Sequence, residues 1–365
     1  MLTNTERAWL RLHLTRGLGR SGLFKLHAQF ESPVPALSAV EVKGTAIFSP
    51  HRARINYPVA EDDPRFIAAC DTLEKCQARI ISFWDEEYPS LLRTIHDPPA
   101  LIYLRGTLDI DQAVGVVGSR RASTQGERTT WMICSDLARS GITIVSGMAR
   151  GIDGVAHEAA LAAGGTTIAV LGCGIDRIYP YENRKLYQQI PEQGAVISEY
   201  PPGTKPLAGH FPGRNRIISG LSRGVLIVEA AEGSGSLITA DFALDQGREV
   251  FAVPGAIQNP NSRGVNRLLK DGAHLVTGAS DIVEIVRPST TISHRQGRPE
   301  SPELLNQKEK TIIEQLGDEP VQVDDLARKS GLTPTELSAI LLQLELRGTV
   351  SQLPGMRYIA AFRRT

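Results

Sequence analysis

The chain has 365 residues and carries 40 basic and 40 acidic side chains, so its formal net charge is zero. At roughly 150 residues per domain, this length predicts two or three domains. The hydrophobic fraction of 41% and charged fraction of 22% exclude a disordered or fibrous protein. No run approaches the roughly 18 apolar residues of a membrane span, and the first 16 residues, with three arginines, exclude a signal peptide. We expect a cytoplasmic protein with no membrane contact.

The four cysteines do not form a metal-binding or disulfide pattern. They contain no C-x-x-C pair, so buried thiols are expected at Cys70, Cys76, Cys134 and Cys173. His157-Glu158 begins like H-E-x-x-H, but Leu161 occupies the position of the second histidine. We expect no metal and no cofactor.

Residues 1–60 form a predicted helical domain with 8 basic and 3 acidic side chains. Its Gly17-Leu18-Gly19 turn between two helices is similar to helix-hairpin-helix DNA-binding modules, of the SAM-like kind. A plain helical cap is the alternative.

Residues 61–288 alternate short β-branched runs with helical patterns, which predicts an α/β fold. The predicted strands are 114–117, 142–145, 167–171, 195–197, 225–228, 249–253 and 273–276, with 78–83 and 101–104 as possible additions. The predicted helices between them are 125–139, 155–163, 183–189 and 237–246. This order indicates a Rossmann-like, doubly wound and mostly parallel sheet covered on both faces.

Residues 289–302 are polar and rich in proline, and we interpret them as a linker. Residues 303–365 predict a winged-helix domain with helices over 304–316, 323–330 and 334–347 and a hairpin over 349–359. Thr333 and Glu336 predict a capping box for the third helix. Because that helix carries Glu336 and Glu345 against Arg347 alone, we expect it to contact protein rather than DNA.

Two loops that follow predicted strands suggest an anion site at the carboxyl edge of the sheet. Gly118, Ser119 and Arg120 precede one helix, and the second loop contains Arg150 before the next helix. Backbone N–H groups at a helix start favour an anion, but an arginine there repels the dipole unless an anion or a carboxylate lies between them. An internal ion pair is the alternative.

The segment from Tyr200 to Val228 contains no acidic residue in 29 positions. It carries Phe211 on an expected loop, and its polar side chains suited to phosphate are Lys205, Arg214, Asn215 and Arg216. An aromatic ring beside such groups is typical of single-stranded nucleic-acid binding, although burial of the ring in the core is the alternative. We expect both arginines to face one channel.

Enzyme motifs are absent or incomplete. The chain lacks a G-x-x-x-x-G-K-[ST] loop and a G-x-G-x-x-G loop that opens a helix. Ser234, Gly235 and Ser236 resemble the phosphate loop of phosphoribohydrolases, but Thr239 stands where their catalytic glutamate would be. We therefore expect phosphate binding without catalysis.

Taken together, the segments resemble the DNA-processing protein A family (DprA, also called Smf). The similar stretches include VGSRRAS (117–123), SGMARGIDGVAHEAAL (146–161), FPGRNRIISGLSRGVLIVEA (211–230) and SRGVNRLLKDGAHLV (262–276). The resemblance implies a non-catalytic protein that binds and protects incoming single-stranded DNA and loads the RecA recombinase during natural transformation. It also implies a homodimer formed through the Rossmann-like domain. Carried over by motif, the DNA site would comprise Gly118, Ser119, Arg120, Arg150, Lys205, Phe211, Arg214, Asn215 and Arg216. A phosphoribohydrolase-type nucleotide-processing enzyme is the alternative, and a winged-helix regulator of duplex DNA is a third.

Overall fold

The computed structural model describes residues 2–48, 55–108, 110 and 112–287, and near the C-terminus 308, 311–312, 315–316, 321–346, 350–353 and 357–360. The chain divides into two compact units, Met1–Ser289 and Thr290–Thr365. The linker predicted over 289–302 lies outside the described residues. Within the described part of the chain, no helix is long and apolar enough to cross a membrane.

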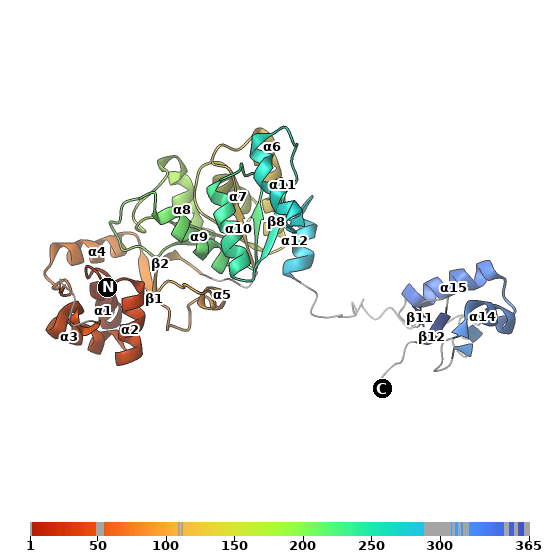
Figure 1. Cartoon of the computed structure of the whole chain (residues 1–365), viewed down its shortest axis with the longest axis horizontal. Helices are drawn as coiled ribbons and strands as arrows, with labels where there is room; N and C mark the ends of the chain where they lie inside the picture. The colour runs from red at the N-terminus through yellow and green to blue at the C-terminus, as the bar shows by residue number, and fades with distance from the viewer. Residues whose placement is uncertain are drawn as a thin grey trace. The chain divides into compact units, whose positions relative to one another are not determined.

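A nine-stranded sheet forms the centre of the first unit (Figure 1). Its order is β1-β2-β6-β5-β4-β3-β7-β8-β9. Strands β3 to β9 pair in parallel, whereas β2 is antiparallel to both β1 and β6. The strands are β1 (Ala78–Ser82), β2 (Leu101–Gly106), β3 (Ala113–Val117), β4 (Thr143–Ser146), β5 (Thr167–Leu171), β6 (Gly194–Ser198), β7 (Gly224–Ile227), β8 (Glu249–Ala252) and β9 (His274–Leu275). The predicted doubly wound, mostly parallel sheet is confirmed.

Helices cover both faces of this sheet because successive strand residues point to opposite sides. On β4, Ile144 packs toward one hydrophobic cluster and Val145 toward another. The first face is covered by α6 (Thr124–Arg139), α7 (Ile152–Ala162), α8 (Arg184–Gln193) and α12 (Ala279–Val286). The opposite face is covered by α9 (His210–Gly220), α10 (Gly235–Asp245) and α11 (Arg263–Lys270), with the short α5 (Ser90–Arg93) beside α9.

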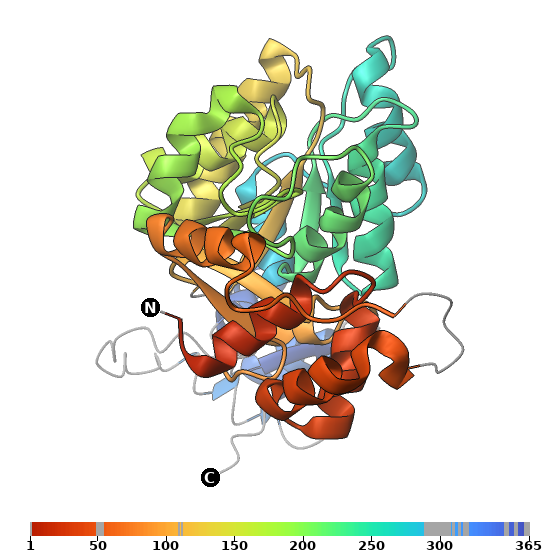
Figure 2. The same cartoon turned by 90° about the vertical axis from the view of Figure 1, so that its left-hand side faces the viewer.

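The N-terminal helices lie beside β1 and β2 of the sheet (Figure 2). Their buried side chains form one hydrophobic cluster with side chains of the sheet. The helices are α1 (Asn4–His13), α2 (Arg20–Phe30), α3 (Pro33–Lys43) and α4 (Pro64–Lys75). Trp9 of α1 stacks on Trp84, which follows β1, with ring centroids 4.9 Å apart, and His27 of α2 stacks on the same ring at 3.9 Å. Large aromatic surfaces are therefore buried where these helices meet the sheet.

The second unit has the elements of a winged helix. A three-stranded sheet in the order β10-β12-β11 accompanies α14 and α15. Their bounds are β10 (Val321–Gln322), α14 (Val323–Ser330), α15 (Pro334–Leu346), β11 (Val350–Leu353) and β12 (Arg357–Ala360). The capping box predicted for α15 is present, because Thr333 N donates to Glu336 at 3.2 Å and Glu336 N donates to Thr333 at 3.4 Å. The helix predicted over 304–316 lies largely outside the described residues.

Candidate nucleic-acid interface

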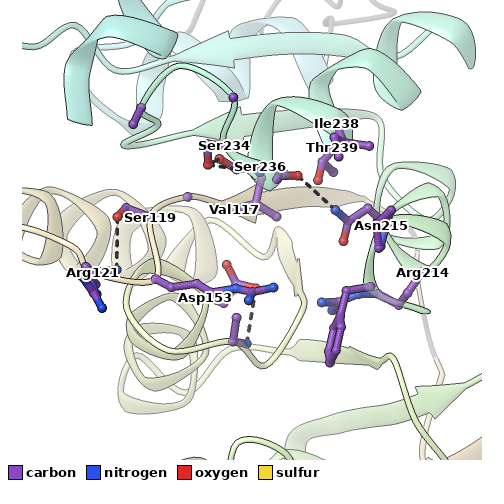
Figure 3. A pocket seen from close by; sticks show the side chains of 18 of the residues that line it. Val117, Ser119, Arg121, Asp153, Arg214, Asn215, Ser234, Ser236, Ile238 and Thr239 are labelled. Atoms are coloured by element: carbon purple, nitrogen blue, oxygen red, sulfur yellow. Dashed lines mark hydrogen bonds between the residues drawn. The ribbon is translucent and has the colours of Figure 1, made fainter. Parts of the chain in front are cut away.

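A cavity of about 710 Å³ opens at the carboxyl ends of the central strands (Figure 3). The chain leaves β3 toward α6 on one face and leaves β7 toward α10 on the other, so the loops separate between these neighbours. Such a topological switch point is where open α/β sheets bind ligands. We call this the strand-end cavity, and its main lining residues are 117–121, 211–212, 214–215 and 231–236.

The segment that carries Phe211 is helical, so the expectation of a loop was wrong. It forms the start of α9, with Gly209 as N-cap and Pro212 in the first turn. Proline is tolerated there because the first N–H groups of a helix have no intrahelical partner. The helix sets the directions of Arg214 and Arg216, because side chains two positions apart on an α-helix point about 200° apart around its axis.

Arg214 lies in the wall of the strand-end cavity and is only 3% exposed. Its Nη1 donates to the Val170 carbonyl at 2.6 Å, and its Nε has no partner among the described residues. A Cβ atom on Gly147 would lie 2.0 Å from Arg214 Nη1, so a larger residue at position 147 would displace this guanidinium. The cavity therefore has a fixed cation in its wall.

Arg216 points away from the cavity, which corrects the expectation that both arginines face one channel. Its guanidinium donates to both carboxylate oxygens of Glu199, at 2.9 and 2.7 Å, and its Nε donates to the Asp97 carbonyl at 2.9 Å. Lys205 is exposed and does not line the cavity either. The absence of acids from this segment did not produce one patch, because Arg216 pairs with acids that lie outside it.

Phe211 and Arg120 meet at the cavity. The Arg120 guanidinium lies 5.6 Å from the centre of the Phe211 ring, a cation–π contact. The ring is half-buried and packs against Gly172, where a Cβ would lie 2.9 Å from it, and Tyr179 lies 5.6 Å away between ring centroids. Core packing and exposure at the site were both left open for Phe211, and its ring combines them. One part of the ring packs against Gly172, and another part lines the cavity.

The start of α10 forms the opposite wall. Ser234 is the N-cap, and its hydroxyl lies 2.8 Å from that of Ser236. Asn215 Nδ2 donates to the Gly235 carbonyl at 3.3 Å, which joins α9 to the first turn of α10. Thr239 also lines the cavity but is 0% exposed. N–H groups and hydroxyls at the positive end of a helix are suited to phosphate.

Asp153 at the start of α7 lines the cavity but is already engaged. Its carboxylate accepts from Gly147 N at 3.2 Å and from Ala149 N at 3.4 Å. Burial raises the pKa of Asp153, whereas the neighbouring Arg214 and the two backbone donors oppose this shift. The side chain holds the 147–153 loop in shape.

The start of α6 is occupied by a carboxylate of the protein itself. Glu229, which follows β7, accepts from Ser123 N at 2.9 Å and also from the Ser123 hydroxyl. A carboxylate of the protein itself therefore lies at the helix start behind Gly118 and Ser119, although it bonds to Ser123 rather than to Arg120. Arg150 also pairs with an internal acid, Glu182, and lines a smaller cavity of about 230 Å³ that shares Arg120 and Phe211 with the first.

Most of the predicted site residues line the strand-end cavity: Gly118, Ser119, Arg120, Phe211, Arg214, Asn215, Ser234, Gly235 and Ser236. Arg121, Tyr179 and Asn261 line it too and were not predicted. Arg121 could have been predicted from the sequence, because it directly follows Arg120. No sequence pattern indicated Asn261, because it joins the cavity through a hydrogen bond across 140 residues of chain, in which Asn261 Nδ2 donates to the Arg121 carbonyl at 3.2 Å.

Comparison with known families decides the family to which this fold and site belong. A family model described as DNA recombination-mediator protein A matches residues 79–287, more than half of the chain. The chain belongs to the DNA recombination-mediator protein A family. A model of the DprA winged helix domain matches residues 296–356, in agreement with the second compact unit. The resemblance read from the motifs is confirmed.

Curated relatives and solved structures agree with this membership. Protein Smf of Escherichia coli (strain K12) is 44% identical over 295 residues, which cover 78% of each chain. DNA processing protein DprA of Streptococcus pneumoniae is 47% identical over 204 residues, or 55% of this chain and 72% of that one. The X-ray structure of DprA from S. pneumoniae matches with a TM-score of 0.62 and 37% identity, covering 77% of this chain and 97% of that one. The structure of DprA from Helicobacter pylori, a protein described as having a unique single-stranded DNA binding mode, matches with a TM-score of 0.53 and 32% identity, covering 58% and 97%.

Proposed function

We propose that this protein binds and protects incoming single-stranded DNA and loads the RecA recombinase onto it during natural transformation, without catalysis of its own. The observation that carries the proposal is the strand-end cavity, which places an aromatic ring, three arginines and a helix start in one concave surface. A stacking surface beside cations suits a strand with unpaired bases, whose π-faces a duplex would hide. The single-stranded DNA binding mode described for the H. pylori protein supports the same ligand class.

The proposal is tested by comparing binding of single-stranded and duplex oligonucleotides of equal length by fluorescence anisotropy. We expect tighter single-strand binding, with salt dependence from phosphate contacts. Each such contact contributes about 0.7 to the slope of log affinity against log salt, so changing Arg120 and Arg121 together to alanine should lower the slope by about 1.4. Arg139→Ala, on the exposed end of α6, is the control and should leave the slope unchanged. Equal affinity for both DNA forms would contradict the proposal.

Phe211 is expected to act by stacking rather than by charge. Phe211→Leu should weaken single-strand binding by about 1–3 kcal/mol while the salt slope stays constant. Leucine keeps apolar contact with Gly172, so a thermal melt close to that of the wild type is expected. Unchanged affinity in the folded variant would remove the ring from the DNA site.

The proposed partners are RecA and a second copy of the chain. Membership in a recombination-mediator family supports the first. Light scattering of the purified protein tests the dimer, which should have twice the mass of the chain. RecA loading is tested on DNA coated with single-strand-binding protein by measuring the lag before RecA ATPase activity begins. This lag should be shorter when the protein is present. A monomeric mass or an unchanged lag would contradict the respective proposal.

A nucleotide-processing enzyme is the second candidate because Glu232 lines the same cavity and is exposed beside the α10 start. We nevertheless propose no turnover. Asp153 is held by two backbone donors, and Thr239 offers a hydroxyl where a general acid or base would be needed. Incubation with nucleoside monophosphates should release no nucleobase. Release that survives further purification and disappears in Glu232→Gln would establish the enzyme instead.

A further inference from the structure

The first turn of α10 contributes a continuous set of donors to the strand-end cavity. Ser234, Gly235 and Ser236 all line it, and the helix that they begin is 11 residues long. The Ser234 hydroxyl already accepts from Ser236 N, while the helix dipole puts partial positive charge at this end. A helix start alone does not identify a ligand. A ligand is indicated here by two buried side chains next to this helix start.

Thr239 is the first of these side chains. It is 0% exposed, and its Oγ1 has no hydrogen-bond partner among the described residues. A helical threonine usually donates to the carbonyl four residues earlier, here that of Gly235. That carbonyl instead accepts from Asn215 Nδ2 over a long 3.3 Å. Asn215 can therefore turn toward a ligand while the Gly235 carbonyl regains a donor from Thr239.

Arg214 is the second buried side chain next to the start of α10. It faces the cavity from α9, is 3% exposed, and keeps an unpartnered Nε. Figure 3 shows Arg214 and Asn215 on one side of the cavity, with Ser234, Ser236 and Thr239 across from Asn215. The nearby Asp153 carboxylate already balances part of the Arg214 charge, but the unpartnered Nε of this buried guanidinium still favours a further acceptor.

The burial of these donors selects the kind of phosphate. An internal phosphodiester carries a sugar on each side and offers two free oxygens, so it fits an open groove. Ser236 and Arg214 are 7% and 3% exposed, so little of either side chain is open to a ligand, and a phosphate with one substituent reaches such donors more easily than one with two. A terminal phosphomonoester has three free oxygens and a charge of about −1.5 to −2 at neutral pH, which suits amide, hydroxyl and guanidinium donors together.

We propose that the start of α10, with Asn215 and Arg214, is a subsite for the terminal phosphomonoester of a nucleotide. Two sources share this chemistry, namely a phosphorylated end of a DNA strand and a free nucleoside monophosphate. The inference rests on the proposed function, because it assigns one end of the bound strand to one wall of the strand-end cavity.

The test compares oligonucleotides of one sequence that carry a 5′-phosphate, a 3′-phosphate or two hydroxyl ends. Both phosphorylated strands should bind about tenfold more tightly than the strand with two hydroxyl ends, the effect of one charge-assisted hydrogen bond. Competition separates the sources. If thymidine 5′-monophosphate displaces the 5′-phosphorylated strand and thymidine does not, the subsite accepts free nucleotides. If neither competes but the end preference holds, the subsite reads strand ends.

Matched variants assign the preference to this wall. Asn215→Asp keeps the shape but puts a negative charge beside the phosphate, and it should abolish the preference for a terminal phosphate. Asn261→Asp introduces the same charge elsewhere on the cavity, so it should weaken all strands alike and leave their ratio unchanged. Thr239→Val, which has the same shape, should lower the ratio, because the Gly235 carbonyl then loses its replacement donor.

The outcomes separate this inference from the proposed function. Tight single-strand binding that is the same with and without a terminal phosphate overturns the phosphomonoester subsite and leaves the DNA-binding proposal standing. Loss of all single-strand binding by the wild-type protein overturns the DNA-binding proposal, whereas calorimetric binding of thymidine 5′-monophosphate would still support the subsite. A ratio that stays the same in Asn215→Asp overturns its placement at α10.

Discussion

His13 shows how burial of one side chain sets a pH dependence of stability. Its Nδ1 lies 2.9 Å from the Tyr103 hydroxyl, and burial lowers the pKa of His13 from 6.5 to about 4. The unfolded chain therefore binds a proton between these values that the folded chain refuses, so stability is present above pH 6.5 and is lost as the pH falls toward 4. By pH 4.5 the loss should be on the order of 2 kcal/mol.

Denaturant unfolding of wild type and His13→Gln at several pH values measures this contribution. Glutamine can still bond to Tyr103 but does not titrate in this range. The difference in unfolding free energy between the two proteins should therefore shrink on acidification, even though His157, whose pKa burial also lowers, titrates in both. If the unfolding free energies of the two proteins changed in parallel with pH, protonation of His13 would cost the folded state no stability.

At the scale of an element, α9 is held in place by Arg216. This side chain pairs with Glu199 after β6 and with Asp97, which itself pairs with Arg20 at the start of α2. Arg216→Ala leaves the mostly buried Glu199 carboxylate without its partner, which should cost about 3 kcal/mol of unfolding free energy. The control Arg139→Ala removes an exposed pair and should cost less than about 1 kcal/mol. Because Arg216 does not face the cavity, the folded variant should keep its salt slope for DNA; a slope reduced by about 0.7 would place it in the site.

At the scale of the whole molecule, the two compact units have separate hydrophobic clusters. All residues that line the strand-end cavity belong to the first unit. A chain that ends at residue 288 should therefore fold and retain single-strand affinity within about threefold, a difference below 1 kcal/mol. Anisotropy titrations of both lengths check this result. If truncation abolished binding while the melt stayed intact, the winged helix would be the principal DNA-binding element.

Local patterns in the sequence predicted the strands, their mostly parallel pairing and the cap of one helix. Apolar runs that alternate with helical patterns predict a doubly wound sheet because each strand must be buried on both faces. The Thr333–Glu336 capping box was predictable for the same reason, since its partners are three residues apart. Gly118, Arg120 and Ser234 were found at the cavity because the carboxyl ends of parallel strands meet at one edge.

Only the tertiary structure decided which charged groups face a ligand. Arg214 and Arg216 are near neighbours in sequence, but the helix turns them to opposite sides, where distant acids hold Arg216. Glu229 reaches the start of α6 from 106 residues away, and Asn261 lines the cavity and bonds to Arg121 across 140 residues. Electrostatic pairing depends on distance in space, and a sequence read along its length contains no direct measure of that distance.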